Sequence, residues 1–339
     1  MPPGLTPHAG TLLQLEGVVK RFQSGLFRRR TTVAVDGVSL SLEAGDSLAI
    51  LGESGSGKST LGRLIARLIP PTRGRILFQG QDLRSLNGAG PTFRRDVQMI
   101  FQDADGSLNP RLTIKELLLE PLLVHGLSSS AMANGGHGGS NGNNAGKEIG
   151  EPERLLDLAG LSPEILSRRP SEISGGQRQR IGILRALSLS PKLIVADEPL
   201  ASLDRSVQAH ILCLMRQAQE RSNVAYVYIS HDIATLRLIA RRVAVIYKGQ
   251  IMESGDVHAV LDAPVHPYTR RLIASDPSRL VLRSKRPAPA VAGRAAPASS
   301  GQNHGCGYAP LCPEACSDCT RIRPELKPVK GREVACLLT

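Results

Sequence analysis

The run from Gly52 to Ser59, GESGSGKS, has the residue types and spacing needed to hold a chain of phosphates. Its glycines let the backbone curl so that successive N–H groups point at phosphate oxygens. An apolar run before it and helically spaced apolar residues after it supply the strand–loop–helix context that such a loop requires. This context disfavours the alternative, a glycine-rich turn that ends in lysine by chance. The Lys58 ammonium would reach the β- and γ-phosphates, and the Ser59 hydroxyl would bind Mg²⁺. We therefore predict a nucleotide site made by Gly52, Ser54, Gly55, Gly57, Lys58, Ser59 and Thr60.

Two adjacent carboxylates, Asp197 and Glu198, follow the apolar run 193–196. The C-terminal ends of parallel strands are where such sheets bind ligands. There Asp197 suits the outer shell of Mg²⁺, and Glu198 suits the general base that polarises an attacking water. Such a pair alone is often only a helix N-cap, but together with a phosphate loop it indicates hydrolysis of the nucleotide.

The elements that must position these residues alternate between strands and helices. Short runs rich in β-branched and other apolar residues predict strands at 12–19, 33–42, 47–51, 75–79, 96–101, 192–196, 224–229 and 243–247. Apolar residues at helical spacing predict helices at 60–69, 181–189, 208–221 and, with an interruption, 113–166. This alternation is typical of an α/β fold with a mainly parallel sheet.

Three segments have compositions that do not suit a packed core. Residues 1–11 are expected to be disordered. Residues 128–150 are rich in Gly, Asn and Ser, which predicts a flexible surface insertion in which His137 is solvated. Residues 276–300 form a Pro/Ala-rich linker that leads to a cysteine-rich extension at 301–339.

Composition excludes several classes of protein. The 339 residues are 41% apolar, as expected of a folded globular chain. No run approaches eighteen apolar residues and the N-terminus lacks the pattern of a signal peptide, so we expect neither a membrane span nor secretion. The net charge of +12 fits a diffuse basic surface or a position near a membrane. Nucleic acid is the less favoured explanation, because only 3% of residues are aromatic and Trp is absent.

Further motifs lie around the two nucleotide elements in a characteristic order. The sequence Ile173-Ser174-Gly175-Gly176-Gln177 resembles the LSGGQ signature of ABC-type ATPases, with Ile in place of the usual Leu. Four more positions match this family over residues 12–275: the Q-loop glutamine, the D-loop aspartate within an A-S-L-D run where S-A-L-D is more usual, the switch histidine, and the aromatic residue that stacks on adenine. These are Gln102, Asp204, His231 and Phe22. Taken singly, Gln102 could be any polar residue at a strand end, His231 a surface histidine and Phe22 part of the core.

The resemblance implies an ABC-type nucleotide-binding domain over 12–275, with an antiparallel β subdomain and a helical subdomain at about 103–190. It implies catalysis by Glu198, His231 and Gln102, and Mg²⁺ bound by Ser59, Gln102 and Asp197. In this family two ATPase subunits pair head-to-tail, and the signature of one closes over ATP held by the other. The residues that would do so here are Ser174, Gly175, Gly176, Gln177 and Asp204.

Within the family, three features resemble the peptide/nickel import group: the run 93–111, the sequence His266-Pro-Tyr-Thr, and the cysteine-rich C-terminal extension. The second ATPase subunit of a dipeptide or oligopeptide importer is the expectation, and a nickel importer is the alternative. The implied partners are a second ATPase subunit, paralogous or identical, two membrane permeases and an extracytoplasmic solute-binding protein. The implied location is peripheral, on the cytoplasmic face of the inner membrane.

Two other classes compete with an importer. A non-transport ABC ATPase that acts on nucleic acid fits the positive charge, but the chain has one nucleotide domain and no long coiled coil. A redox- or metal-sensing protein would make the C-terminal extension its main feature.

Five of the six cysteines, Cys306, Cys312, Cys316, Cys319 and Cys336, lie in that extension. In an intracellular chain such clustering favours metal over disulfides. Cys306, Cys312, Cys319 and Cys336 resemble a motif of peptide-importer ATPases that can hold a [4Fe–4S] cluster. Four thiolates suit Zn²⁺ equally, and free thiols are a third possibility. Cys213, between Leu212 and Leu214, is expected in the core.

Overall fold

The computed structural model describes residues 10–24, 30–85, 90–102, 106–127, 152–201, 203–276 and 305–339. The insertion predicted at 128–150, most of the linker at 276–300 and residues 1–9 of the N-terminus lie outside the described residues.

An eight-stranded sheet with the order β11-β12-β10-β9-β3-β8-β7-β6 runs through the molecule. Its five consecutive strands β9, β3, β8, β7 and β6, of which β6 forms one edge of the sheet, are parallel, and β10 joins them antiparallel to β9. Every residue of β3, β7 and β8 is buried, which explains why these strands read as continuous apolar runs. The strands are β3 (Ser47–Leu51), β6 (Val97–Ile100), β7 (Leu193–Asp197), β8 (Ala225–Ile229), β9 (Arg242–Tyr247) and β10 (Gln250–Asp256).

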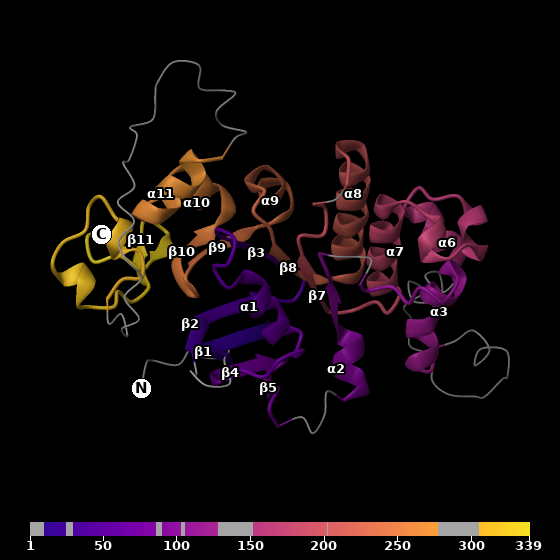
Figure 1. Cartoon of the computed structure of the whole chain (residues 1–339), viewed down its shortest axis with the longest axis horizontal. Helices are drawn as coiled ribbons and strands as arrows, with labels where there is room; N and C mark the ends of the chain where they lie inside the picture. Colours follow the sequence, from indigo (N-terminus) through magenta and orange to yellow (C-terminus); the bar gives the residue numbers. More distant parts are fainter. Residues whose placement is uncertain are drawn as a thin grey trace, which may run out of the picture.

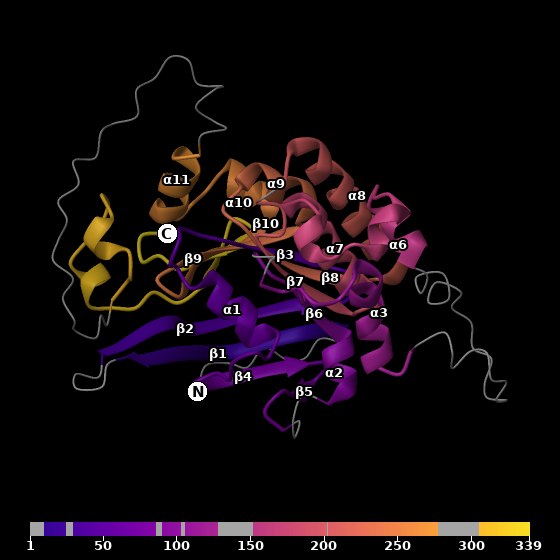
Figure 2. The same cartoon turned by 45° about the vertical axis from the view of Figure 1, so that its right-hand side comes forward.

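A second, antiparallel sheet with the order β2-β1-β4-β5 faces the first across helix α1 (Figures 1 and 2). Leu61, Leu64 and Ile65 of α1 fill one core between the two sheets. The strands of this sheet are β1 (Thr11–Ser24), β2 (Arg30–Glu43), β4 (Arg73–Phe78) and β5 (Gln81–Asp82), and the helix is α1 (Lys58–Ile65).

The other face of the large sheet is covered by helices, which form a second core with it. Helices α3, α6 and α7 gather at one end of the molecule (Figure 1). The helices are α2 (Pro91–Asp96), α3 (Ile114–Val124), α6 (Pro152–Leu158), α7 (Gly175–Leu187), α8 (Arg205–Ser222), α9 (Ile233–Ile239), α10 (Val257–Asp262) and α11 (Pro267–Ala274), with 3₁₀ turns η1 (Pro163–Ser167) and η2 (Pro170–Glu172). No helix among the described residues is both long and apolar enough to cross a bilayer.

Residues 305–339, here called the tail, pack at the opposite end of the molecule beside β10 and α11 (Figure 1). The tail contains two 3₁₀ turns, η3 (Ala309–Leu311) and η4 (Asp318–Thr320), and two short strands, β11 (Lys327–Val329) and β12 (Arg332–Val334). β12 pairs with β10 and so extends the large sheet by two strands.

Several predicted boundaries need correction. Helix α1 ends at Ile65 instead of continuing to residue 69, because Arg67 has the left-handed φ of 55°. Helix α8 begins three residues earlier than predicted, because Asp204 caps its N-terminus. Helix α7 begins at Gly175, six residues before the apolar periodicity that predicts it, because Ser174 caps its N-terminus. β10 was not predicted.

The expectation that Cys213 lies in the core is wrong, because its side chain is exposed. It occupies the outer face of α8, where the Gln217 amide donates to its sulfur at 3.4 Å.

Candidate active site

The phosphate loop joins β3 to α1, and its glycines are required by close packing. A Cβ at Gly57 would lie 2.1 Å from the Ala34 carbonyl oxygen, and one at Gly52 would lie 2.3 Å from the Ile246 oxygen. Gly55 and Gly57 also have left-handed φ values of 77° and 104°. The loop is thus curled against two strands in a shape that only glycine permits.

The Lys58 side chain is buried and folds back over this loop. Its ammonium donates to the carbonyl oxygens of Gly52 at 2.8 Å and Glu53 at 2.9 Å. Burial lowers the pKa of Lys58, and the carboxylates of Glu198, Asp197 and Glu53 partly offset that effect. A cation over a curled backbone loop suits polyphosphate.

The Ser56 hydroxyl of the same loop is buried and has no hydrogen-bond partner among the described residues. It packs inside the curled loop, close to where a Cβ at Gly52 would lie.

Ser59 and Asp197 meet at the ends of two neighbouring elements. The Ser59 hydroxyl donates to Asp197 Oδ1 at 3.1 Å, and burial of Asp197 raises the pKa of its carboxyl group. A hydroxyl and one carboxylate are hard oxygen ligands that suit Mg²⁺, which takes its remaining ligands from phosphates and water. The residues present therefore fit a Mg²⁺–nucleotide complex.

Glu198 lies between two polar side chains from the ends of neighbouring strands. Its Oε1 is 3.0 Å from His231 Nδ1, and its Oε2 accepts from Gln102 Nε2 at 3.1 Å. The backbone of Glu198 has the left-handed φ of 47°, and its N–H donates to the Ile229 oxygen at 2.8 Å. Such strain in a non-glycine residue is characteristic of functional sites. Three predicted catalytic residues thus come together through β6, β7 and β8.

The signature and D-loop residues lie at helix starts in this chain. Ser174 Oγ accepts from the Gln177 N–H at 3.2 Å, and Gln177 Oε1 accepts from the Ser174 N–H at 2.9 Å. Asp204 Oδ1 accepts from the Val207 N–H at 2.9 Å. Ser174 and Gly175 are exposed at the N-terminus of α7, where the helix dipole favours an anion.

The other three predicted binding residues have partly or fully exposed side chains. Phe22 is 42% exposed, so it is not a core residue, and the Lys20 ammonium lies 5.2 Å from the centre of its ring. Ser54 is exposed in the loop, and Thr60 is half-buried in α1.

Two residues near the site were not predicted. The buried Gln179 donates to the Pro199 oxygen at 2.9 Å and so supports the turn that carries Glu198. The Glu53 N–H of the phosphate loop donates to the Tyr268 hydroxyl at 3.2 Å. Burial raises the pKa of Tyr268 to about 12, so this hydroxyl is neutral. The sequence could have indicated Gln179, because it is a polar residue on the buried face of α7. No local sequence feature indicated that Tyr268 contacts the phosphate loop.

The tail cysteines lie outside this site. Cys306, Cys312, Cys319 and Cys336 line one small cavity next to Tyr308. Among the described residues, however, no three His, Cys, Asp or Glu side chains are grouped so that they could hold a metal ion.

Comparison with known proteins agrees with this geometry. Residues 35–201 match the family described as ABC transporter, and residues 252–319 match the family described as oligopeptide/dipeptide transporter, C-terminal region. The chain is 42% identical to the oligopeptide transport ATP-binding protein AppF of Bacillus subtilis over 333 residues, which cover 94% of each chain. This chain belongs to the ATP-binding proteins of ABC transporters.

Other relatives and solved structures are consistent with this membership. The glutathione import ATP-binding protein GsiA of Salmonella typhimurium is 46% identical over 79% of this chain and 42% of its own length. A dimeric, post-hydrolysis structure of the ATP-binding cassette MJ0796 with ADP and Pi has a TM-score of 0.61 and 27% identity, and the match covers 73% of this chain and 99% of that one. As an ABC ATPase, the chain binds ATP with Mg²⁺ and hydrolyses it.

Proposed function

We propose that this ABC ATPase powers the import of di- or oligopeptides across a membrane. The observation that carries the proposal is the Glu198 carboxylate, held by Gln102 and His231 beside the Ser59–Asp197 pair. The import of peptides is supported by the match of 252–319 to the oligopeptide/dipeptide transporter region and by the names of relatives.

In the proposed reaction, Glu198 accepts the proton of the attacking water, and Gln102 and His231 orient its carboxylate. Lys58 and the loop N–H groups stabilise charge on the β- and γ-phosphates. Mg²⁺ bound by Ser59, Asp197 and Gln102 would neutralise further charge on these phosphates. Phe22, exposed near the end of β1, would stack on adenine.

This site is proposed to be half of a shared one. Ser174 to Gln177 and Asp204 of a second ATPase subunit, identical or paralogous, would close over the γ-phosphate. Support comes from the exposed N-terminus of α7 and from the dimeric structures of the similar MJ0796 cassette.

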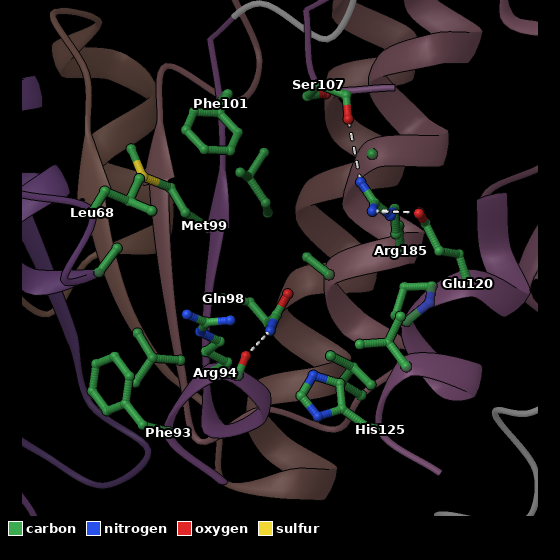
Figure 3. A pocket seen from close by; sticks show the side chains of 18 of the residues that line it. Leu68, Phe93, Arg94, Gln98, Met99, Phe101, Ser107, Glu120, His125 and Arg185 are labelled. Carbon is green, nitrogen blue, oxygen red and sulfur yellow. Dashed lines mark hydrogen bonds and ion pairs between the residues drawn. The ribbon is translucent and has the colours of Figure 1, made fainter. Parts of the chain in front are cut away.

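A cavity of about 460 Å³ between β6 and the helices α3 and α7 is the proposed docking site for a permease (Figure 3). Phe101 is 39% exposed and Val124 is 75% exposed at its wall, which suits an apolar partner. Arg185 spans the cavity wall, with a 2.6 Å ion pair to Glu120 and a 3.2 Å hydrogen bond to the Ser107 oxygen (Figure 3). Phe101 directly precedes Gln102, so a permease segment here would lie one residue from a side chain that touches Glu198.

Around this site we propose a nucleotide-binding domain at 12–275, with a helical subdomain at about 103–190 and the tail as an extension. Two permeases would hold the chain on the cytoplasmic face of the membrane, and a solute-binding protein would deliver substrate. Nickel import is the second candidate for the same machinery.

A [4Fe–4S] cluster in the tail is less well supported. Four thiols line one cavity, but no three of the candidate ligands described are within reach of one ion. The lack of a three-ligand group among the described residues argues against a single zinc ion, whereas four thiols around one cavity are the donor set of a cluster, with one thiolate for each iron. No step of the reaction is derived through either metal. Anaerobic purification followed by an optical spectrum and metal analysis tests this point.

The function is tested by affinity purification of the tagged chain from detergent-solubilised membranes. Two integral-membrane permeases and a second ATPase subunit should co-purify. Cells that express this complex should take up labelled tripeptide, and cells with the Lys58→Ala chain should not. Uptake of ⁶³Ni²⁺ instead of peptide would select the nickel alternative. Nucleic acid in place of permeases, retained with a steep salt dependence, would contradict an importer.

A further inference from the structure

The peptide group between Gly52 and Glu53, at the start of the phosphate loop, is held at both of its polar ends. Its carbonyl oxygen, that of Gly52, accepts from the Lys58 ammonium at 2.8 Å. Its N–H, that of Glu53, donates to the Tyr268 hydroxyl of α11 at 3.2 Å. Because a peptide group is planar, its carbonyl and its N–H cannot turn separately. The Tyr268 hydroxyl therefore helps to fix the carbonyl that holds the Lys58 ammonium.

Tyr268 is itself held in place by its surroundings. Its N–H lies in the first turn of α11 and donates to His266 Nδ1 at 3.0 Å. Its ring packs against two other buried tyrosine rings, with centres 4.6 Å away at Tyr247 of β9 and 5.3 Å away at Tyr308 of the tail. With the backbone bonded and the ring packed, the hydroxyl is presented to the loop in one position.

The tail reaches the phosphate loop by a second route as well. Arg323 of the tail forms a 2.9 Å ion pair with Asp36 of β2. The Asp36 N–H donates to the Gly249 oxygen at 2.9 Å, and the Gly249 N–H donates to the Ser56 oxygen of the loop at 2.8 Å. The tail is thus connected to the loop at both Glu53 and Ser56.

We propose that Tyr268 is a positioning residue for nucleotide binding, and that the tail keeps it in position through Tyr308. Its hydroxyl fixes the Gly52–Glu53 peptide, and with it the direction from which Lys58 reaches the phosphates. When nucleotide binds, the ammonium turns from the carbonyl oxygens to the phosphates, while Tyr268 still holds the N–H of the same peptide. The inference concerns nucleotide binding alone, so it stands or falls independently of the transported substrate.

The first test is Tyr268→Phe, which keeps the ring but removes the acceptor for the Glu53 N–H. The peptide can then turn away in the free loop, and the apparent Kd rises as the fraction of chains with a correctly shaped loop falls. We expect the Kd for Mg²⁺–ADP and the KM for ATP to rise about 5-fold, which corresponds to one lost hydrogen bond. The kcat should stay within about 2-fold of the original, because the contacts of Glu198 are unchanged.

Tyr308→Phe is the matched control, since it removes a hydroxyl from the same aromatic cluster, one that bonds to the Arg271 side chain. Calorimetric titration of each full chain with Mg²⁺–ADP gives the Kd and also the binding stoichiometry, which should stay near one nucleotide per chain if the fold is retained. A general loss of stability would affect both variants alike. An unchanged Kd in Tyr268→Phe, an equal rise in both variants, or a fall in kcat at unchanged KM would refute the positioning role.

The contribution of the tail is tested by Tyr308→Leu, which removes the ring that packs against Tyr268. We expect the Kd for Mg²⁺–ADP to rise in this variant at unchanged stoichiometry, whereas Tyr308→Phe, which keeps the ring, should bind normally. Adding Tyr308→Leu to Tyr268→Phe should raise the Kd by less than the two single effects combined, because both changes loosen the same peptide. An unchanged Kd in Tyr308→Leu, or fully additive effects, would contradict support of Tyr268 by the tail.

Discussion

Glu198 illustrates how a few contacts of one residue set the chemistry of the site. A carboxylate acts as a general base only if its oxygen faces the water. Here Gln102 and His231 each contact a different oxygen of Glu198, and the left-handed backbone turns the side chain away from the strand direction. Asp197, one residue earlier, points instead to Ser59. The two adjacent carboxylates therefore contact different partners and suit different roles.

Replacing Glu198 by Gln should leave ATP binding intact and lower the ATPase rate about 10²- to 10⁴-fold, because the amide cannot accept the proton. ATP should then hold the ATPase pair closed, which size-exclusion chromatography with and without ATP would detect. Glu220→Gln, in an exposed pair with Arg216 on α8, is the control and should hydrolyse ATP at the normal rate. Near-normal turnover in Glu198→Gln would remove Glu198 from its role.

Among the elements, α11 depends on a buried histidine at its N-terminus. His266 is 1% exposed, and its Nδ1 accepts from the Tyr268 N–H at 3.0 Å. This bond requires the neutral ring. Burial, together with the charge of Arg270, lowers the pKa of His266 to about 4 from the ordinary 6.5. The helix start that positions Tyr268 is therefore sensitive to acid.

Because the pKa of His266 is lower in the folded chain than in the unfolded chain, the folded state loses stability as the pH falls. The unfolded chain binds a proton at His266 more readily than the folded chain does, so the stabilising contribution is complete above pH 6.5 and is lost as the pH falls to about 4. We expect the free energy of unfolding to drop by about 3 kcal/mol over this range from His266 alone. His266→Asn keeps an N-cap acceptor without titrating. Denaturant unfolding at pH 7 and pH 4 should show a smaller drop in this variant, and an equal drop would contradict the assignment.

At the scale of the whole molecule, the tail is attached through a buried ion pair. Arg332 of β12 lies 3.4 Å from Glu253 of β10, with side chains 7% and 0% exposed. Glu253 also accepts from the N–H groups of Val265 and His266, at 3.0 and 2.9 Å. One buried carboxylate therefore joins the large sheet, the segment before α11 and the tail.

Arg332→Met should lower the free energy of unfolding by about 3 kcal/mol, because it leaves the Glu253 charge buried without its partner. Adding Glu253→Gln should recover part of this loss. Arg270→Met is the matched control, since its 2.9 Å pair with Glu314 also joins the body to the tail but is exposed, and it should cost less than about 1 kcal/mol. Equal losses for both arginine variants in urea unfolding would show that burial is not the cause.

The sequence by itself determined the parts that depend on neighbouring residues. Fully buried strands such as β3 and β8 were predicted within a residue, because runs of apolar residues mark them directly. The phosphate loop was evident because glycines, lysine and serine at fixed spacing have few other uses. Apolar periodicity missed the starts of α7 and α8, since their polar first turns, which follow the caps Ser174 and Asp204, carry no such periodicity.

Only the tertiary structure decided which distant residues meet. Gln102, Glu198 and His231 converge because β6, β7 and β8 are neighbours in the sheet, and strand order is a property of the whole packed chain. The same holds for the contact between Glu53 and Tyr268, which are 215 residues apart. The exposure of Cys213 also depended on which face of α8 meets the core. The type of each residue determines which interactions its side chain can make. Burial and strand order determine which partner it meets.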